Sequence, residues 1–177
     1  RARAAERRAA GVDVVNLSVG EPDFPTPPAV IEATRAFFEA GRVTYTAAAG
    51  LPELRDAVAR HLGAPHELDI PRDGVVVTCG AKHALYLALQ VLCDDGDEVV
   101  FASPYWVSYP EMARLAGARF AVVPTRGEDG FRLDPAALEA AISDRTRVVI
   151  LNSPSNPTGA VLSRANLEAV VNVAMQR

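Results

Sequence analysis

Residues 75–106 read VVVTCGAKHALYLALQVLCDDGDEVVFASPYW, and this stretch decides the fold class. The apolar run Val75–Thr78 predicts a strand, the amphipathic stretch Ala81–Leu92 a helix, and Glu98–Ala102 a second strand. A strand, a helix and another strand in close succession are typical of parallel strands joined by a crossover helix. The stretch therefore predicts an α/β fold.

The same alternation continues on both sides of this stretch. Further strands are predicted at Arg119–Val123 and Arg147–Leu151, and further helices at Arg1–Ala10, from Thr26-Pro27 to about Ala40, at Pro52–Leu62, at Val107–Ala116, from Asp134-Pro135 onward and from the N-cap Ser163 onward. In the second of these helices, the Thr26 hydroxyl is expected to act as the N-cap and Pro27 as the first helical residue. Short apolar strands between amphipathic helices predict a mostly parallel sheet with helices on both faces.

Composition narrows the functional classes. Of the 177 residues 49% are hydrophobic and 23% charged, which favours a globular protein. The net charge of −4 disfavours nucleic acid and membranes as partners. Two cysteines without a CxxC pair favour a reduced, cytoplasmic protein. Three histidines without HExxH spacing predict no metal site. There are 17 arginines but one lysine, so Lys82 is the only residue of the chain that a lysine-dependent reaction could use.

Ligands in parallel α/β sheets lie at the carboxyl ends of the strands, where three loops stand out. In the first loop, Thr78–Lys82, Gly80 and Ala81 would let a phosphate approach the free N–H groups of a helix start. The alternative is an ordinary tight turn. Because the chain contains neither a P-loop nor a GxGxxG pattern, a phosphate site rests on this loop alone.

The other two loops carry an aromatic residue and two amides. Trp106 follows Ser103-Pro104-Tyr105 and could stack on a flat heterocycle, or it could fill the groove between sheet and helix. Asn156, in the loop Asn152–Gly159, could donate a hydrogen bond to a ligand oxygen, although Asn-Pro and Thr-Gly are also common in plain turns.

Together these motifs resemble the class I/II aminotransferases, pyridoxal-phosphate enzymes typified by bacterial aspartate aminotransferase. The resemblance covers nearly the whole chain and rests on the segments Leu17–Phe24, Tyr45, Ala49–Arg55, Thr78–Leu85, Asp95–Val99, Ser103–Pro110 and Asn152–Gly159. It implies the fold-type-I architecture, with residues 27–177 as the first part of the large, cofactor-binding domain and residues 1–26 as a segment of the small domain. One departure is Asp95, where the family commonly has proline.

The resemblance also implies roles for individual residues. Backbone N–H groups of Gly80, Ala81 and Lys82 are expected to bind the phosphate of pyridoxal 5'-phosphate. The residues expected to contact the cofactor ring and the substrate are Trp106, which stacks on the ring, Asn156, which hydrogen-bonds the phenolic oxygen, and Gly20, which lies beside the substrate carboxylate. Tyr45 is expected to reach the cofactor phosphate of a neighbouring subunit, in a homodimer with shared active sites.

The activity implied is transamination between an amino acid, with aspartate favoured, and a 2-oxo acid. The lysine that forms the Schiff base is expected beyond Arg177, so no catalytic residue is assigned here and residues 1–177 alone are expected to be an inactive fragment. Alternatives are a β-lyase or aminocyclopropane-carboxylate synthase reaction on the same fold, or a truncated subunit without activity. A nicotinamide dehydrogenase is disfavoured by the lack of GxGxxG.

Overall fold

The computed structural model describes residues 2–15, 20–41 and 44–176. The chain divides into two units, Arg1–Thr46 and Ala47–Arg177, and each is described by itself. Part of the predicted Leu17–Phe24 motif, Leu17–Val19, lies outside the described residues. The assignment of residues 1–26 to a small domain stays a prediction.

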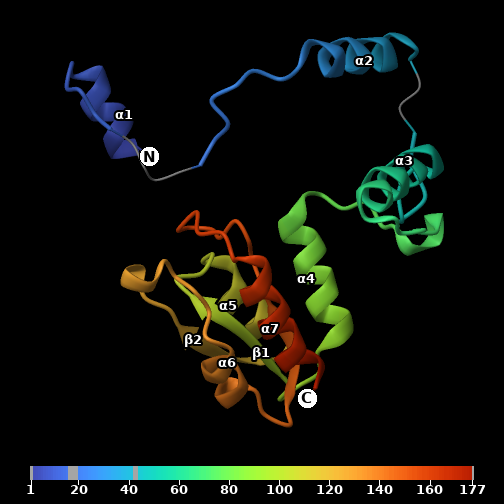
Figure 1. Cartoon of the computed structure of the whole chain (residues 1–177). Coiled ribbons are helices and arrows are strands. Elements are labelled where there is room, and N and C mark those ends of the chain that lie inside the picture. Colours follow the sequence, from blue (N-terminus) through green and yellow to red (C-terminus); the bar gives the residue numbers. More distant parts are fainter. Residues whose placement is uncertain (1, 16–19, 42–43, 177) are drawn as a thin grey trace. The chain divides into compact units, whose positions relative to one another are not determined.

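A three-stranded parallel sheet is the centre of the unit Ala47–Arg177 (Figure 1). The strands are β1 (Glu98–Ser103), β2 (Arg119–Pro124) and β3 (Thr146–Ile150), in the order β2-β1-β3. Val100 of β1 is paired with Ala121 on one side and with Val149 on the other. The predictions of a parallel sheet and of these three strands are confirmed.

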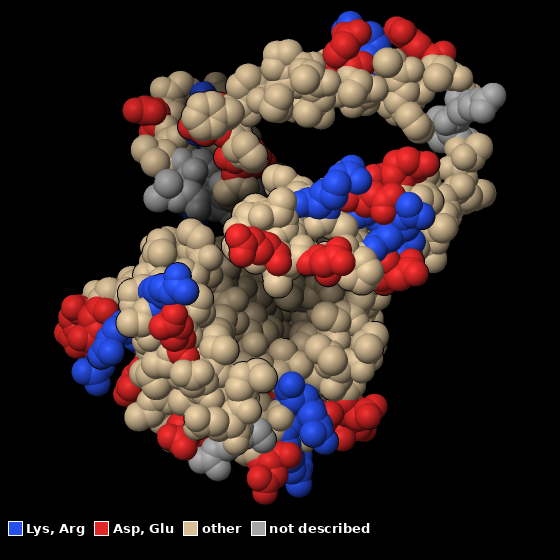
Figure 2. Space-filling model, turned by 45° about the vertical axis from the view of Figure 1, so that its right-hand side comes forward, with Lys and Arg blue, Asp and Glu red and all other residues tan. Residues whose placement is uncertain are grey.

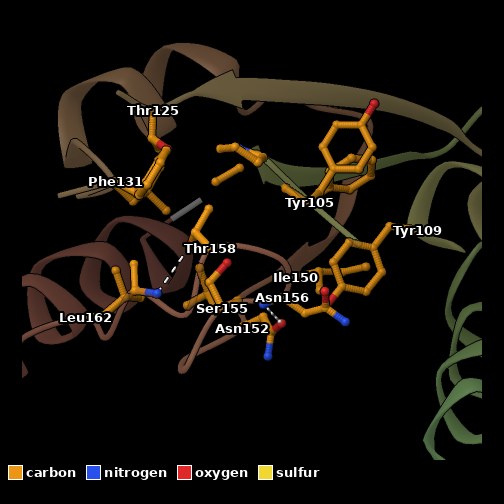
Figure 3. Close-up of a pocket in the computed structure, with 16 residues that line it drawn as sticks. Tyr105, Tyr109, Thr125, Phe131, Ile150, Asn152, Ser155, Asn156, Thr158 and Leu162 are labelled. Carbon is orange, nitrogen blue, oxygen red and sulfur yellow. Dashed lines mark hydrogen bonds between the residues drawn. The ribbon is translucent and has the colours of Figure 1, made fainter. Parts of the chain in front are cut away.

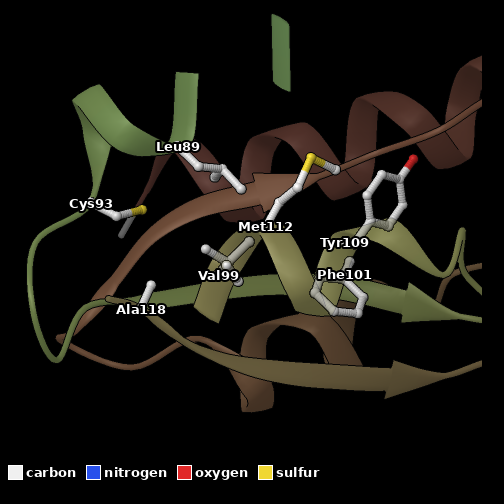
Figure 4. Close-up of a cluster of buried hydrophobic side chains, with 8 residues drawn as sticks. Leu89, Cys93, Val99, Phe101, Tyr109, Met112 and Ala118 are labelled. Atoms are coloured by element: carbon white, nitrogen blue, oxygen red, sulfur yellow. The ribbon is translucent and has the colours of Figure 1, made fainter. Parts of the chain in front are cut away.

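Helices cover both faces of this sheet, as predicted. They are α4 (Ala81–Leu92), α5 (Ser108–Leu115), α6 (Pro135–Ala141) and α7 (Arg164–Met175). Because side chains alternate along β1, Val99 and Phe101 pack against α4 and α5, in the cluster drawn in Figure 4, whereas Val100 packs against α6 and α7. All three β1 side chains are at most 2% exposed, so the core is formed on both sides of the central strand.

The predicted strand Val75–Thr78 is wrong. The backbone is extended there, with φ −116° and ψ 127° at Val75. A strand also needs a ladder, and no described strand lies alongside this segment. Its hydrogen bonds instead go to a loop and a side chain: the Val77 N–H donates to the Ala49 carbonyl over 2.9 Å, and Arg55 Nε donates to the Val75 carbonyl over 2.8 Å.

Before α4 the chain forms α3 (Pro52–Gly63) and the short 3₁₀ helices η1 (Ala64–His66) and η2 (Arg72–Gly74), and after β2 it forms η3 (Gly127–Asp129). Two predicted helix starts are confirmed by side-chain caps. Asp134 accepts a hydrogen bond from the Ala136 N–H at the start of α6, and Ser163 accepts one from the Asn166 N–H at the start of α7.

The unit Arg1–Thr46 contains α1 (Ala2–Ala9) and α2 (Pro28–Glu39). The prediction that Thr26 caps α2 is wrong: the N-cap is Pro27, without a side-chain cap, and Pro28 is the first helical residue. Because Pro28, and not Pro27, takes the first helical position, the helix begins one residue later than predicted. No described residue of this unit is buried. Across the described ranges, no helix is long and apolar enough to cross a bilayer.

Candidate functional site

The loop Thr78–Lys82, named the phosphate loop below, is fixed by its own hydrogen bonds. The Gly80 N–H donates to the Thr78 carbonyl over 2.8 Å, and the Thr78 hydroxyl donates to the Gly80 carbonyl over 3.1 Å. Of the three N–H groups predicted to bind the phosphate, that of Gly80 is therefore engaged within the loop, and those of Ala81 and Lys82 are not. The Cys79 N–H donates to Nδ1 of His83, one turn into α4, over 3.3 Å. The local geometry therefore holds the loop and the first turn of α4 together.

This arrangement leaves the first amides of α4 available to a ligand. No described residue accepts a hydrogen bond from the backbone N–H groups of Ala81, Lys82 and His83, and no side chain caps the helix. Gly80, the N-cap, has φ +83° and ψ 168°, and no atom lies within 4 Å of the position that a Cβ would take. Free N–H groups, the positive end of the helix dipole and open space together form a cradle that fits a phosphate group.

Trp106 lies beside this cradle. Nζ of Lys82 lies 5.0 Å from the centroid of the indole ring, within the range of a cation–π contact. The indole is half-buried: it packs against the core cluster around Phe101, and its ring centroid is 5.7 Å from that of Tyr109 in an edge-on contact. A second ring that stacked on the same indole face would displace the Lys82 ammonium, which is exposed and on a flexible stem.

Asn156 is held by its backbone, whereas its side-chain amide has no described partner. It lies in a turn, and its N–H donates to Oδ1 of Asn152 over 2.9 Å. The other end of the loop is tied down by a hydrogen bond of 3.0 Å from the Leu162 N–H to Oγ of Ser153. The loop is thus anchored while the amide of Asn156 remains free to bind a ligand.

A pocket of about 50 Å³ lies beneath this loop, at the carboxyl ends of β1 and β3 (Figure 3). Tyr105 and Tyr109 line it from the segment after β1, and Asn152 and Asn156 from the loop after β3. Its interior lining is mainly apolar, with Phe101 and Ile150 among the contributors.

The structure thus brings part of the predicted site together. Lys82 contacts Trp106, Trp106 contacts Tyr109, and Tyr109 lines the same pocket as Asn156, so a series of contacts links residues of the three loops. Gly20 and Tyr45 belong to the other unit. Both are exposed there, Tyr45 completely. Their predicted roles are not tested by this arrangement.

Three residues that support the loops were missed in the sequence. The Thr125 hydroxyl and N–H both donate to the carbonyl of Ser103, over 2.7 and 3.0 Å, at the point where the Trp106 loop leaves β1. His83 accepts from the phosphate loop, which its position four residues after Cys79 could have indicated. Arg55 holds the segment before that loop, and nothing in its helical pattern distinguishes it from a surface arginine.

Ionisation adds little to the site. Burial raises the pKa of the Tyr109 hydroxyl, which keeps it neutral, and burial raises the pKa of the Cys93 thiol, with Asp97 and Asp94 adding to the effect. Away from the site, the hydrogen bond from Arg72 lowers the pKa of Asp56. In the part of the chain that the structure describes, no group of three or more His, Cys, Asp or Glu could hold a metal ion.

Charge is mixed over the surface. Figure 2 shows basic and acidic side chains interspersed on the face in view, without a large area of one sign. The net charge of −4 agrees with this distribution. On this face, the surface offers no electrostatic footprint for a polyanion.

Comparison with known proteins gives consistent results. The family model for aminotransferase class I and II matches residues 12–177. The aspartate/prephenate aminotransferase of Thermus thermophilus is 46% identical over 99% of this chain, and the aspartate aminotransferase of Bacillus subtilis is 40% identical over 99%. These alignments cover 46% and 44% of the two relatives, so the chain spans about half the length of the curated relatives it matches.

Solved structures agree with these relatives. The aspartate aminotransferase of Thermus thermophilus with maleate matches with a TM-score of 0.93 at 46% identity, over 99% of this chain and 46% of that one. The aspartate aminotransferase of Thermotoga maritima matches with a TM-score of 0.95 at 44% identity, over 99% of this chain and 47% of that one. The fold-type-I architecture predicted from the motifs is thereby confirmed.

Proposed function

The chain belongs to the class I and II aminotransferase family, and from this premise we propose that it forms part of an enzyme that transfers an amino group between an amino acid and a 2-oxo acid with pyridoxal 5'-phosphate as cofactor. Aspartate is the favoured amino acid. The observation that carries the proposal is the phosphate cradle at Gly80 beside the indole of Trp106, bridged by Lys82.

The residues present fit the cofactor. The N–H groups of Ala81 and Lys82 would donate to the phosphate, and the missing side chain at Gly80 would let it approach the helix. Trp106 would stack on the pyridine ring, and the free amide of Asn156 would donate to the phenolic oxygen. When bound, the cofactor withdraws electrons from the substrate Cα, while the chain's own residues bind and orient it.

Lys82 is not assigned as the lysine that attaches the cofactor. Its backbone N–H belongs to the phosphate loop, and its ammonium lies over the indole face of Trp106 on which the pyridine ring would stack, so it is not assigned to the cofactor's aldehyde. Because Lys82 is the only lysine of the sequence, residues 1–177 alone are expected to show no turnover.

The substrate class follows from the relatives. Several are named aspartate or aspartate/prephenate aminotransferases, and the Thermus thermophilus structure holds maleate, a four-carbon dicarboxylate like aspartate. These names support aspartate as amino donor and make prephenate a second oxo acid to assay. β-Lyase and aminocyclopropane-carboxylate synthase reactions remain the alternatives on this fold, because fold alone does not fix the reaction.

The assembly proposed is a homodimer with shared active sites. Tyr45 supports this assignment, since its side chain is completely exposed in its own unit and is free to bind the cofactor phosphate of a partner subunit. Gly20, also exposed, is assigned to the substrate carboxylate. Size measurement of the intact protein, with and without Tyr45→Phe, separates a dimerisation role from a phosphate-binding role.

The experiment that tests the function is an assay of the intact protein with aspartate and added cofactor, with and without 2-oxoglutarate or prephenate. Without an oxo acid, transamination stops after at most one oxaloacetate per cofactor molecule, because the cofactor keeps the amino group. With an oxo acid the reaction continues, and one glutamate or arogenate accompanies each further oxaloacetate. Repeated turnover without an oxo acid, with release of ammonia, would assign the lyase alternative. No product under either condition, together with no binding of the cofactor, would contradict the proposal.

A further inference from the structure

Arg55, on α3, holds the segment that leads into the phosphate loop. Its Nε donates to the Val75 carbonyl over 2.8 Å, and its Nη2 donates to the Arg72 carbonyl over 2.9 Å. Nη2 also lies 3.2 Å from Oδ1 of Asp73, and the Arg55 side chain is 13% exposed. The planar guanidinium therefore spans two backbone carbonyls that lie three residues apart, which a single-point donor could not do.

The loop before α3 holds the same segment from a second point. The Ala49 carbonyl accepts from the Val77 N–H over 2.9 Å. Gly50 packs against the Val77 side chain so closely that a Cβ at position 50 would lie 2.8 Å from the Val77 Cβ. No described strand pairs with this segment. The contacts with Arg55, Ala49 and Gly50 therefore fix its backbone, as ladder hydrogen bonds fix the backbone of a strand.

The segment 72–78 leads directly into the phosphate loop, which has hydrogen bonds of its own. Thr78 and Gly80 exchange two hydrogen bonds, and Cys79 is bound to His83 of α4. Between Val75 and Gly80, each residue except the exposed Val76 thus takes part in a hydrogen bond. The free N–H groups of Ala81 and Lys82 are the first part of the segment left open to a ligand.

We propose that Arg55 is a positioning residue for the cofactor phosphate, acting through the backbone of residues 72–78; this inference rests on the proposed function. Donors that are fixed before binding hold a phosphate without the cost of ordering a loop. Without Arg55 the segment loses two carbonyl contacts and the phosphate loop must be ordered by the ligand. Loss of Arg55 should therefore weaken binding of the phosphate group. Binding of the pyridine ring should not change, because the ring is assigned to Trp106, which lies in the loop after β1.

The test compares the affinities of the intact apoprotein for pyridoxal phosphate and for pyridoxal, which lacks the phosphate. The ratio of the two dissociation constants isolates what the phosphate contributes. Arg55→Met removes both carbonyl contacts, and Arg55→Lys keeps the charge but not the planar fork. Arg164→Gln is the control: it removes an exposed arginine that pairs with Glu168 on α7 and leaves residues 72–78 and their contacts with α3 in place.

Arg55→Met is expected to weaken pyridoxal phosphate binding about tenfold, equal to about 1.4 kcal/mol, with pyridoxal binding unchanged within about twofold. Arg55→Lys is expected to lie between this variant and the unsubstituted protein, and Arg164→Gln to match the unsubstituted protein. An unchanged ratio in Arg55→Lys, or a parallel loss for both ligands in either Arg55 variant, would overturn the positioning role.

The two proposals fail in different ways. If the unsubstituted protein binds neither ligand, the proposed function is wrong. If it prefers pyridoxal phosphate over pyridoxal and the Arg55 variants keep that preference, only the inference about Arg55 is wrong. Should Arg55→Met fail to fold, the Arg55→Lys ratio alone decides the outcome.

Discussion

Replacing Gly80 by alanine tests the phosphate cradle itself. Gly80 has φ +83° and ψ 168°, a region of backbone space that is essentially restricted to glycine. Nothing lies within 4 Å of the position of the new Cβ, so the substitution meets no steric clash inside the chain. Its cost is therefore backbone strain, about 1–3 kcal/mol, together with a methyl group in the space where the phosphate would lie.

The strain can be relieved only by moving the loop that supplies the amides. At about 1.4 kcal/mol per factor of ten, Gly80→Ala is expected to weaken pyridoxal phosphate binding by about 5- to 150-fold. The assay is titration of the intact apoprotein, followed by the visible absorption of the bound cofactor. Pyridoxal affinity is expected to change far less, because pyridoxal makes no use of the loop.

Gly96→Ala provides the matched control. Gly96 also has a positive φ, +89°, and no atom closer than 4.0 Å to its Cβ position, but it lies before β1 at the opposite end of the sheet. This variant is expected to lose stability without losing cofactor affinity. If Gly80→Ala bound pyridoxal phosphate as tightly as the unsubstituted protein, the phosphate would not lie at this loop.

Three further predictions address the ring site, the core and the acid stability. Trp106→Ala should weaken cofactor binding about 2- to 12-fold, for a stacking energy of about 0.5–1.5 kcal/mol, and should shift the absorption of the bound cofactor. Trp106→Phe should retain most of the affinity and most of the absorption. If affinity and absorption were unchanged in the alanine variant, Trp106 would be a packing residue only. Asn166→Ala should lower the free energy of unfolding in urea by about 1–3 kcal/mol, because the buried Asn166 amide donates to the Leu133 carbonyl over 2.7 Å; a change below about 0.5 kcal/mol would refute this. Because Arg72 lowers the folded-state pKa of Asp56, the stabilisation by that carboxylate is present above its unfolded-state pKa of about 3.9 and is lost as the pH falls through the folded-state pKa. The gap between the urea midpoints of Asp56→Asn and the unsubstituted protein should therefore shrink from pH 6 towards pH 2.5, and an equal gap at both ends would contradict the pairing.

Elements that depend on local chemistry could be predicted from the sequence. The apolar run at 98–102 lies between an acidic turn and a proline-containing loop, and the structure has a strand there, β1, which ends one residue later than predicted. Asp134 and Ser163 cap their helices as predicted, because a cap involves residues two or three positions apart. The family resemblance also rested on such short segments, and the family match over residues 12–177 confirms it.

Contacts between distant segments could not be predicted in this way. Val75–Thr78 has the composition of a strand, yet whether it joins a ladder depends on its neighbours, and here those are Ala49 and Arg55. The contact of Lys82 with Trp106 likewise joins residues 24 positions apart through the packing of α4 on α5. For Tyr45 and Gly20, the roles stay predictions from the resemblance.

A crystal structure of the intact protein with pyridoxal phosphate would show whether the cofactor phosphate binds at the start of α4. We expect phosphate oxygens within about 3.2 Å of the backbone nitrogens of Ala81 and Lys82. We also expect the pyridine ring stacked on Trp106, with the Lys82 ammonium displaced from that face, and the Asn156 amide at the phenolic oxygen. A phosphate bound elsewhere, with Lys82 still over the indole, would contradict the proposed phosphate and ring sites.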